Sequence, residues 1–277
     1  MEIWSKISKK NIIAYVKSTR CNDGGYVYYR MPPSSGLDTF YALSILKLLG
    51  EKITHKEETV NFIESLAGPE NVNDLYIIIK CHQLLGRSVA EFNDRVKNLI
   101  SLYLAEFVSK DKELFYDVVS IFEQASKALE LTQLFDLKIK KEPLKKKVLS
   151  CQKPSGGFGK NYSKLADTFY AVKILSQIGC FDEKVKDRAL QYLKNRRFYQ
   201  FSDSRFIEDI YYLAEIHQLL SIPLPNPDGF LNFISNCQKN GGFARNYPQA
   251  IVTLGYTYMA VKVLLFLENK KPHLLDF

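Results

Sequence analysis

Aspartates recur at the start of apolar segments along this 277-residue sequence. Each could stabilise the start of a helix or take part in a reaction with a substrate. They are Asp38, Asp74, Asp117, Asp167 and Asp209. In the first turn of a helix an aspartate caps free backbone amides and compensates the helix dipole. Two such carboxylates about 5.5 to 9.5 Å apart could instead hydrolyse a glycoside. We expect the capping role, and glycoside hydrolysis remains an alternative.

Basic residues accompany glycine turns close to several of these segments. They are Lys160, Lys164, Arg205 and Arg245. Lysine and arginine side chains hold phosphate oxygens, and arginine can do so with two parallel hydrogen bonds, so this group would suit a diphosphate. The alternative is ordinary solvated surface charge.

Aromatic side chains are concentrated in the same apolar segments of the sequence, which holds 17 Tyr and 18 Phe. They include Phe40, Tyr41, Tyr76, Phe115, Tyr116, Phe169, Tyr170, Tyr211, Tyr212, Tyr256 and Tyr258. Most of them are expected to pack the core. A subset could line a pocket for a polyprenyl or acyl chain, at about 0.8 kcal/mol per buried methylene. Tyrosine faces could also stabilise a carbocation formed there.

The composition, 46% hydrophobic and 25% charged, excludes disordered, collagen-like and mini-protein classes. A net charge of +8 weakly favours an acidic partner, but the densest basic stretch, 138–147, is typical of a solvated turn and helix face, so we expect no nucleic acid. No apolar run reaches the roughly 18 residues of a spanning helix, and the charged first residues do not resemble a signal peptide. We therefore expect a cytoplasmic protein without a transmembrane segment.

One phrase occurs three times, as Cys21-Asn-Asp-Gly-Gly-Tyr26, Cys151-Gln-Lys-Pro-Ser-Gly-Gly-Phe158 and Cys237-Gln-Lys-Asn-Gly-Gly-Phe243. Each copy leads into a dense apolar segment. Asp38 and Asp167 are 129 positions apart, and Asp74 and Asp209 are 135 apart, so residues 136–277 repeat residues 1–135. We predict a single domain over residues 1–277 that is one tandem array.

The apolar segments alternate with amphipathic ones in a pattern that favours paired helices. Dense segments begin near residues 38, 74, 115, 166, 207 and 253, and amphipathic segments precede them at 7–20, 56–67, 91–108, 143–151, 183–195 and 228–237. Six buried helices surrounded by six half-exposed ones form an all-α (α/α)6 toroid. The glycine pairs fall between outer and inner helices, where glycine permits a positive φ or a close approach of two backbones.

These phrases resemble the repeats of protein prenyltransferase β subunits, Cys-Gln-x-x-x-Gly-Gly-Phe followed by Asp-x-x-Tyr, and more distantly those of squalene and hopene cyclases. The resemblance covers nearly the whole chain. It implies a central funnel lined with aromatic side chains that holds a farnesyl or geranylgeranyl chain, with basic residues at the rim for the diphosphate. It also implies a helical protein partner. The cyclase acid motifs Asp-x-Asp-Asp and Asp-Cys-Thr-Ala-Glu, and the thioester phrase Gly-Cys-Gly-Glu-Gln, are absent.

In this family an Asp-x-Cys pair and a later His hold zinc, which binds the acceptor thiolate. The family's segment aligns without a gap on Lys164, Asp167 and Tyr170, and Phe169 stands in place of the ligand cysteine. Counting inner helices back from the last one places the pair on Asp209 and Tyr211 instead, again without a thiolate. The family's histidine falls on Tyr256. Because two of three ligands are missing in either alignment, we predict no catalytic zinc.

The cysteines offer no clear substitute for that site. The five are widely spaced and never form Cys-x-x-Cys, which argues against a disulfide framework or a zinc finger and favours a reducing compartment. A zinc site of Cys81, His82 and His217 would require side chains at equivalent repeat positions to converge, although such positions lie apart around a ring.

The sequence therefore predicts a prenyltransferase-like toroid that binds an isoprenoid diphosphate, with or without prenyl transfer. Its expected catalytic residues are Asp167 and Tyr170. Its expected ligand-binding residues are Lys160, Lys164, Tyr41, Tyr76, Phe169, Arg205, Asp209, Tyr211, Arg245 and Tyr256. No resident cofactor is expected, although Mg²⁺ could accompany the diphosphate. The alternatives are a catalytically inactive toroid that binds a protein or a lipid, a terpene cyclase-like activity and a glycosidase.

Overall fold

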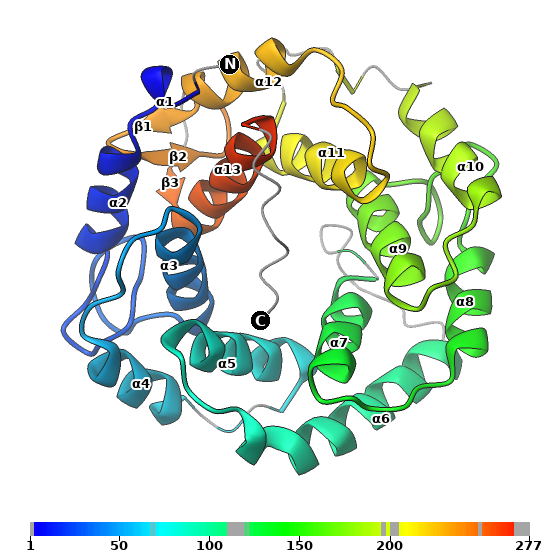
Figure 1. The fold of residues 1–277 in the computed structure, drawn as a ribbon, viewed down its shortest axis with the longest axis horizontal. Coiled ribbons are helices and arrows are strands. Elements are labelled where there is room, and N and C mark those ends of the chain that lie inside the picture. Colours follow the sequence, from blue (N-terminus) through cyan, green and yellow to red (C-terminus); the bar gives the residue numbers. More distant parts are fainter. Residues whose placement is uncertain are drawn as a thin grey trace.

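Helices arranged around one axis make up the architecture (Figure 1). The computed structural model describes residues 3–66, 68, 70–109, 120, 122–194, 198–199, 205–248 and 251–268. The inner helices are α3 (Gly36–Leu48), α5 (Val72–Leu85), α7 (Glu123–Leu134), α9 (Leu165–Gln177), α11 (Ile207–Leu219) and α13 (Leu254–Leu267). The outer helices are α2 (Lys9–Ser18), α4 (Lys56–Ser65), α6 (Asn93–Ser109), α8 (Lys141–Ser150), α10 (Glu183–Lys194) and α12 (Pro227–Asn236).

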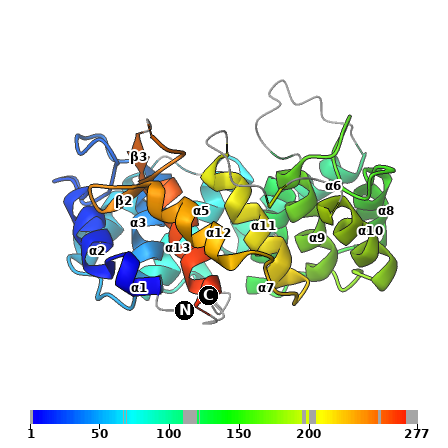
Figure 2. The same ribbon diagram turned by 90° about the horizontal axis from the view of Figure 1, so that it is seen from above.

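Contacts between neighbouring inner helices run around the whole ring, and α13 packs against α3 as well as against α11, which closes it. Seen edge-on, the helices form a disc in which inner and outer helices lie side by side (Figure 2). The predicted (α/α)6 toroid is confirmed. Two short helices, α1 (Ile3–Lys6) and the 3₁₀ helix η1 (Ala90–Phe92), complete the described helices.

The outer helices bury one stripe, as their amphipathic sequences predict. In α10 the buried side chains are Val185, Ala189, Tyr192 and Leu193, spaced at i, i+4, i+7 and i+8. The inner helices are buried on several sides instead. In α3, Ala42, Leu43, Ile45 and Leu46 are each at most 2% exposed. The two kinds of helix therefore differ in how many neighbours cover them.

The third inner helix starts later than predicted. We expected its start near residue 115, and α7 begins at Glu123. Before it, the Ser120 hydroxyl accepts a hydrogen bond from the backbone amide of Phe122, 3.1 Å away, in a turn that leads into the helix. The sequence prediction followed apolar density, which does not mark where helical hydrogen bonding begins. Phe115, Tyr116 and Asp117 lie outside the described residues.

The glycine pairs bring each turn into close contact with the next outer helix. The first glycine of each pair, Gly24, Gly156 and Gly241, has a φ of +92°, +92° and +86°. A Cβ there would lie 2.0 to 2.4 Å from a backbone oxygen of the next outer helix, at Glu58, Arg188 and Asn11 respectively. Both expected uses of glycine, the positive φ and the close approach, are therefore combined at one position. Because Asn11 belongs to α2, the last pair links the end of the chain to its beginning.

A threonine of the inner helix secures each of these turns. The Thr39, Thr168 and Thr257 hydroxyls each accept a hydrogen bond of 3.0 Å from the backbone amide of the residue after a glycine pair. Each hydroxyl also donates to a carbonyl four residues earlier. All three threonines are 0% exposed, so the hydroxyls satisfy backbone groups that water cannot reach.

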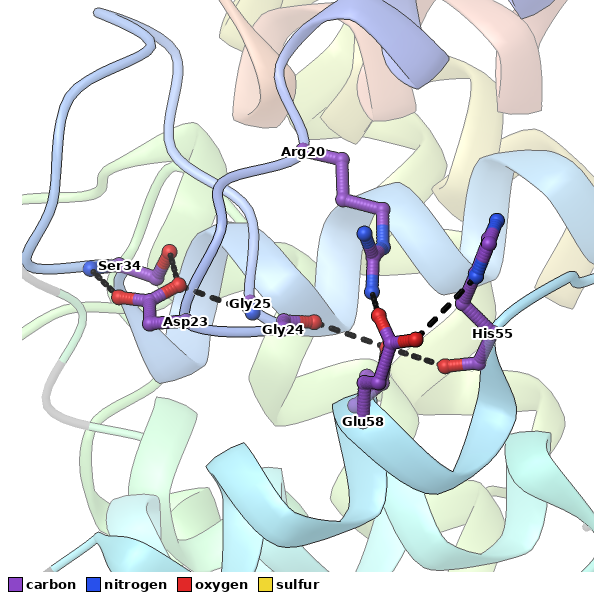
Figure 3. A network of polar contacts seen from close by, with 8 residues as sticks. Arg20, Asp23, Gly24, Gly25, Ser34, His55 and Glu58 are labelled. Atoms are coloured by element: carbon purple, nitrogen blue, oxygen red, sulfur yellow. Dashed lines mark hydrogen bonds and ion pairs between the residues drawn. The ribbon is translucent and has the colours of Figure 1, made fainter.

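The first turn shows how a glycine pair is tied to the neighbouring outer helix (Figure 3). Arg20 forms an ion pair with Glu58 of α4, and the Thr59 hydroxyl donates to the Gly24 carbonyl at 2.8 Å. Across the turn, the Asp23 carboxylate accepts hydrogen bonds from the Ser34 amide (2.9 Å) and hydroxyl (2.6 Å). The turn is therefore held from both of its ends.

The structure also shows that the cysteines of the three repeat copies are not equivalent. Cys151 and Cys237 are the C-terminal cap residues of α8 and α12, but in the first copy Thr19, not Cys21, caps α2. The carbonyls of Thr19, Cys151 and Cys237 each accept a hydrogen bond from the segment after the glycine pair. Cys21 lies two residues further along the turn.

The β-structure is small and belongs to one of these turns. Strands β1 (Gln238–Lys239), β2 (Gly242–Ala244) and β3 (Val252–Thr253) form an antiparallel sheet at the third glycine pair. The other two turns have isolated bridges at the corresponding place. Among the described residues, no helix is long and apolar enough to cross a membrane.

Candidate ligand site inside the ring

An aromatic layer lines the inside of the ring. It consists of Phe40, Tyr41, Tyr76, Phe169, Tyr170, Tyr211, Tyr212 and Tyr258, on α3, α5, α9, α11 and α13. Ring centroids are 6.1 Å apart for Phe40 and Tyr76, 5.3 Å for Tyr41 and Tyr258, 6.5 Å for Tyr258 and Tyr211, and 6.0 Å for Tyr211 and Phe169. The layer is thus continuous from α5 through α3, α13 and α11 to α9.

Tyrosines of this layer influence one another across the ring. Burial raises the pKa of Tyr170 well above its usual value, and the nearby Glu123, Tyr212 and Tyr41 raise it further. Tyr41 is on α3, on the opposite side of the ring from α9 (Figure 1). Two side chains from opposite helices therefore come close enough to influence each other. Helix α7 supplies no aromatic side chain, and the Lys127 ammonium lies 5.7 Å from the ring centroid of Tyr76.

A charged ring follows the aromatic layer along the inner helices. Its members are Lys80, Glu130, Lys173, Glu215 and Lys262, on α5, α7, α9, α11 and α13 in turn, so the charges alternate. Glu130 lies 3.7 Å from Lys80 and 2.6 Å from Lys173, and Glu215 lies 3.2 Å from Lys262. With a helical rise of 1.5 Å per residue, this ring lies about 5 to 6 Å beyond the aromatic layer.

Ion pairs within the charged ring, which has three lysines and two glutamates, shift the pKa values of its members. Burial would raise the pKa of Glu130, but Lys173 and Lys80 and hydrogen bonds from Lys173 and Tyr76 lower it to about 2. Burial lowers the pKa of Lys173, and the Glu130 carboxylate outweighs this, so its pKa is raised. For Lys80 burial prevails and the pKa falls. The Tyr76 hydroxyl donates to Glu130 at 2.7 Å, and this hydrogen bond connects the aromatic layer to the charged ring.

The charged ring was not predicted to be functional, although a periodic signal in the sequence marks it. Lys80, Lys173 and Glu215 each follow the first-turn aspartate of their helix by six residues, and Lys262 follows Tyr256 by six. The corresponding residue of α3 is Ser44, 3% exposed. Aligning the inner segments on their first turns would have shown the alternation.

Four of the predicted residues gather at the start of α11 and α13. Arg245 Nε donates to Glu208 Oε1 at 2.8 Å. Burial raises the pKa of Asp209, and the positive charges of Arg205 and Arg245 oppose that rise. Burial also raises the pKa of Tyr256, to which Glu208 adds and which Arg245 opposes. We call Arg205, Glu208, Asp209, Arg245 and Tyr256 the mouth cluster. Glu208 was not predicted from the sequence.

The other predicted polar residues lie at the start of α9. Asp167 is 2% exposed in the first turn, and a Cβ at Gly159 would lie 3.3 Å from its carboxylate. The Lys164 ammonium lies 5.3 Å from the centroid of the exposed Tyr162 ring. Lys160 is exposed, and its carbonyl accepts a hydrogen bond of 2.5 Å from the Lys153 ammonium. Tyr170 packs in the aromatic layer, 4.7 Å from Phe169 between ring centroids.

The expected capping by aspartate needs a correction. The side-chain caps are Ser35 of α3 and Asn71 of α5, which accept from the amides of Asp38 and Asp74. Asp74 also accepts a hydrogen bond from the Asn71 side-chain amide at 2.8 Å, so the two side chains are linked. Asp38 accepts from the Tyr28 amide, at 3.4 Å. The aspartates stand in the first turn, where their charge still suits the dipole.

The side chains of this site do not fit a zinc ion. Within the described ranges, no three His, Cys, Asp or Glu side chains lie close enough together to hold a metal. Phe169 and Tyr211, which replace the family's ligand cysteine in the two alignments, pack against each other in the aromatic layer. The alternative grouping of Cys81, His82 and His217 is not formed, since the two ring nitrogens of His217 lie against Tyr199 and the Pro223 carbonyl.

Comparison with known proteins assigns the family. The prenyltransferase alpha-alpha toroid domain matches residues 1–74 and 114–272, and the chain belongs to this family. The structure is similar to Candida albicans protein geranylgeranyltransferase-I complexed with GGPP, with a TM-score of 0.70 and 14% sequence identity over 96% of this chain and 92% of that chain. At this identity the likeness shows a shared fold. No curated protein matched the sequence.

Proposed function

We propose that this toroid binds an isoprenoid diphosphate inside the ring, with the apolar chain on the aromatic layer. The observation that carries the proposal is the continuity of that layer over five inner helices. Aromatic rings bury methylene and methyl groups without requiring hydrogen bonds from them, and each buried methylene contributes about 0.8 kcal/mol. The family and the geranylgeranyltransferase-I fold support this choice of ligand.

The diphosphate would lie at the mouth of the ring. Arg205 and Arg245 of the mouth cluster supply guanidinium groups, and Lys160 and Lys164 lie at the start of the neighbouring α9. Since Arg245 is already paired with Glu208, a diphosphate would have to compete for it or recruit Mg²⁺ to the carboxylates. Carboxylate oxygens are the ligands that Mg²⁺ prefers, so Glu208 and Asp209 suit that role.

Prenyl transfer would require a leaving diphosphate and a stabilised allylic cation. Arginine and lysine at the mouth would neutralise the diphosphate as its bond to carbon breaks. The raised pKa keeps the Tyr170 hydroxyl protonated, so the face of its ring, and not a phenolate, would stabilise the positive carbon. The Asp167 carboxylate is the proposed acceptor for the proton of the attacking nucleophile.

A second function, a non-catalytic interaction module, has an observation of its own in its favour. The charged ring places buried ammonium and carboxylate groups only about 5 to 6 Å beyond the aromatic layer. An apolar chain that entered along the axis would meet these charges, and desolvating them is unfavourable. In this case the inner side chains hold the ring together, and one face of the ring would bind a protein partner such as a helical subunit.

Calorimetric titration with farnesyl and geranylgeranyl diphosphate, with and without Mg²⁺, distinguishes the two functions. Binding in the micromolar range supports the first. Lys164→Ala and Arg245→Ala should then weaken it about tenfold each, a change of about 1.4 kcal/mol, whereas Lys146→Ala on the exposed side of α8 should not. The absence of heat and of a thermal shift at high micromolar ligand would overturn the first function and favour the second.

Metal analysis of the purified protein tests the chemistry separately. We expect no stoichiometric zinc, because phenylalanine and tyrosine occupy the ligand positions. One zinc per chain would contradict the alignment of Phe169, Tyr211 and Tyr256, and would require a site formed elsewhere in the chain.

A further inference from the structure

His82 of α5 has both ring nitrogens buried without a hydrogen-bond partner. The side chain is 3% exposed, and the Phe92 ring packs edge-on against it at 5.3 Å between centroids. Burial lowers the pKa of His82, with opposing contributions from Glu64 and Glu91, so the imidazole is neutral at pH 7. A neutral imidazole has one N–H donor and one acceptor nitrogen, and both are unused here.

The second half of the ring contains an equivalent histidine whose two ring nitrogens have partners. His217 follows His82 by 135 positions, the same spacing as Asp74 and Asp209. Its Nε2 lies 2.8 Å from the Tyr199 hydroxyl, and its Nδ1 lies 2.9 Å from the Pro223 carbonyl. In the first half Ser88 stands at the position of Pro223, and the two ring nitrogens of His82 have no hydrogen-bond partner. The acidic side chains that act on His82 are Glu64 and Glu91.

A cavity of about 440 Å³ occupies this place between α4 and α5. It is lined by Glu57, Val60, Asn61, Glu64, His82, Arg87, Ser88 and Glu91. Glu57 is paired with Arg87, so Glu64 and Glu91 give the lining a net negative charge. Within the described parts of the chain, no three acidic or His side chains are close enough to hold a metal ion. A bare metal ion is therefore not the expected ligand.

We propose that this cavity binds a small amino alcohol, with its ammonium group beside the Glu64 and Glu91 carboxylates and its hydroxyl group at the unpartnered His82 imidazole. An ammonium group has donors and no acceptor, which suits acidic side chains. A hydroxyl oxygen accepts the imidazole N–H, as the Pro223 carbonyl does beside His217. The site lies between an outer and an inner helix and is independent of the ligand proposed for the ring interior.

Titration of the ¹⁵N-histidine-labelled protein with 4-amino-1-butanol tests the proposal, with ring nitrogen resonances as the readout. The sequence holds four histidines, so assignment by substitution is straightforward. We expect saturable shifts of the His82 resonances in the millimolar range, while those of His217 stay unchanged. The matched uncharged probe, 1,4-butanediol, should bind at least tenfold more weakly.

Two kinds of variant keep the test independent of folding. Glu64→Gln and Glu91→Gln, both on exposed side chains, should each weaken binding at least threefold, and Glu183→Gln on α10 should not. Glu64→Lys reverses the charge beside the proposed ammonium group and should abolish binding. Unchanged His82 resonances at saturating probe, equal affinity for the diol, or binding that Glu64→Lys leaves intact would each overturn the proposal.

Discussion

The Lys173 ammonium of α9 lies 2.6 Å from the Glu130 carboxylate of α7, and both side chains are about four-fifths buried. The two residues are 43 positions apart, so the contact exists only because the ring brings α7 and α9 together. Glu130 also pairs with Lys80 of α5. One carboxylate thus compensates two ammonium groups from the helices on either side of it.

Substitution of Glu130 should destabilise the protein more than loss of a surface charge. Glu130→Gln leaves Lys80 and Lys173 buried without a counter-charge, and breaking a buried pair in this way costs about 3 to 5 kcal/mol. Chemical denaturation monitored by circular dichroism measures the loss. The exposed Glu142→Gln on α8 is the control and should change the free energy of unfolding by less than about 0.5 kcal/mol. Equal effects of the two substitutions would contradict the burial of the network.

Stability should fall in acid because of the same carboxylate. The pKa of Glu130 is about 2 in the folded protein and near 4.5 without its partners. Because the folded-state pKa is the lower one, the stabilisation is complete above about pH 5 and is lost as the pH falls towards 2, on the order of 3 kcal/mol in total. Unfolding measured between pH 7 and pH 3 should show this loss in the wild type. In Glu130→Gln the corresponding part of the pH dependence should be absent.

The close approach at the second glycine pair should be intolerant of a methyl group. Gly156→Ala would place a Cβ 2.0 Å from the Arg188 carbonyl oxygen at a φ of +92°, so the turn and α10 must separate. We expect a loss of about 3 kcal/mol or more, from overpacking together with left-handed strain.

Gly179→Ala separates these two causes. Gly179 has a φ of +68°, but a Cβ at this position would have no other atom within 4 Å. Its substitution should therefore cost only the left-handed strain, about 1 to 2 kcal/mol. Thermal and urea unfolding of both variants provide the comparison, and a Gly179→Ala loss as large as that of Gly156→Ala would rule out backbone contact as the reason.

The threonine that secures each turn should be replaceable by serine but not by valine. Thr168→Val keeps the shape but leaves the buried Phe158 amide without its acceptor, which costs about 1 to 3 kcal/mol. Thr168→Ser retains the hydroxyl and should lose less. Amide hydrogen exchange at Phe158 should accelerate in Thr168→Val alone, and unchanged exchange would mean that another group satisfies the amide.

Much of the fold could be predicted because the repeat depends on interactions between residues close together in the sequence. The glycine pairs at Gly24, Gly156 and Gly241 mark the turns, since only glycine accepts both the positive φ and the contact found there. Apolar density then separates inner from outer helices. The start of α7 was misplaced because the apolar density of the sequence begins near residue 115, whereas helical hydrogen bonding begins only after the turn at Ser120, at Glu123.

The candidate site was predicted less completely. Residue types and spacing indicated the aromatic layer and the residues at the mouth, including Arg205 and Arg245. They did not indicate that Glu208 is paired with Arg245. The two residues are 37 positions apart and meet where the Ile207 amide of α11 donates to the Arg245 carbonyl. Nor did they distinguish His82 from His217, which have the same neighbours in sequence, Gln-Leu-Leu, but different partners in space.

The sequence by itself determined the toroid, its glycine turns and the presence of aromatic, acidic and basic residues on its inner segments, since periodicity and turn chemistry act over a few residues. Only the tertiary structure decided which charges compensate one another. Closing the ring buries Lys80, Glu130 and Lys173 together, and burial makes their pairing obligatory. Whether a charged side chain faces a partner, a ligand cavity or water depends on helices far apart in the chain, and no local pattern carries that information.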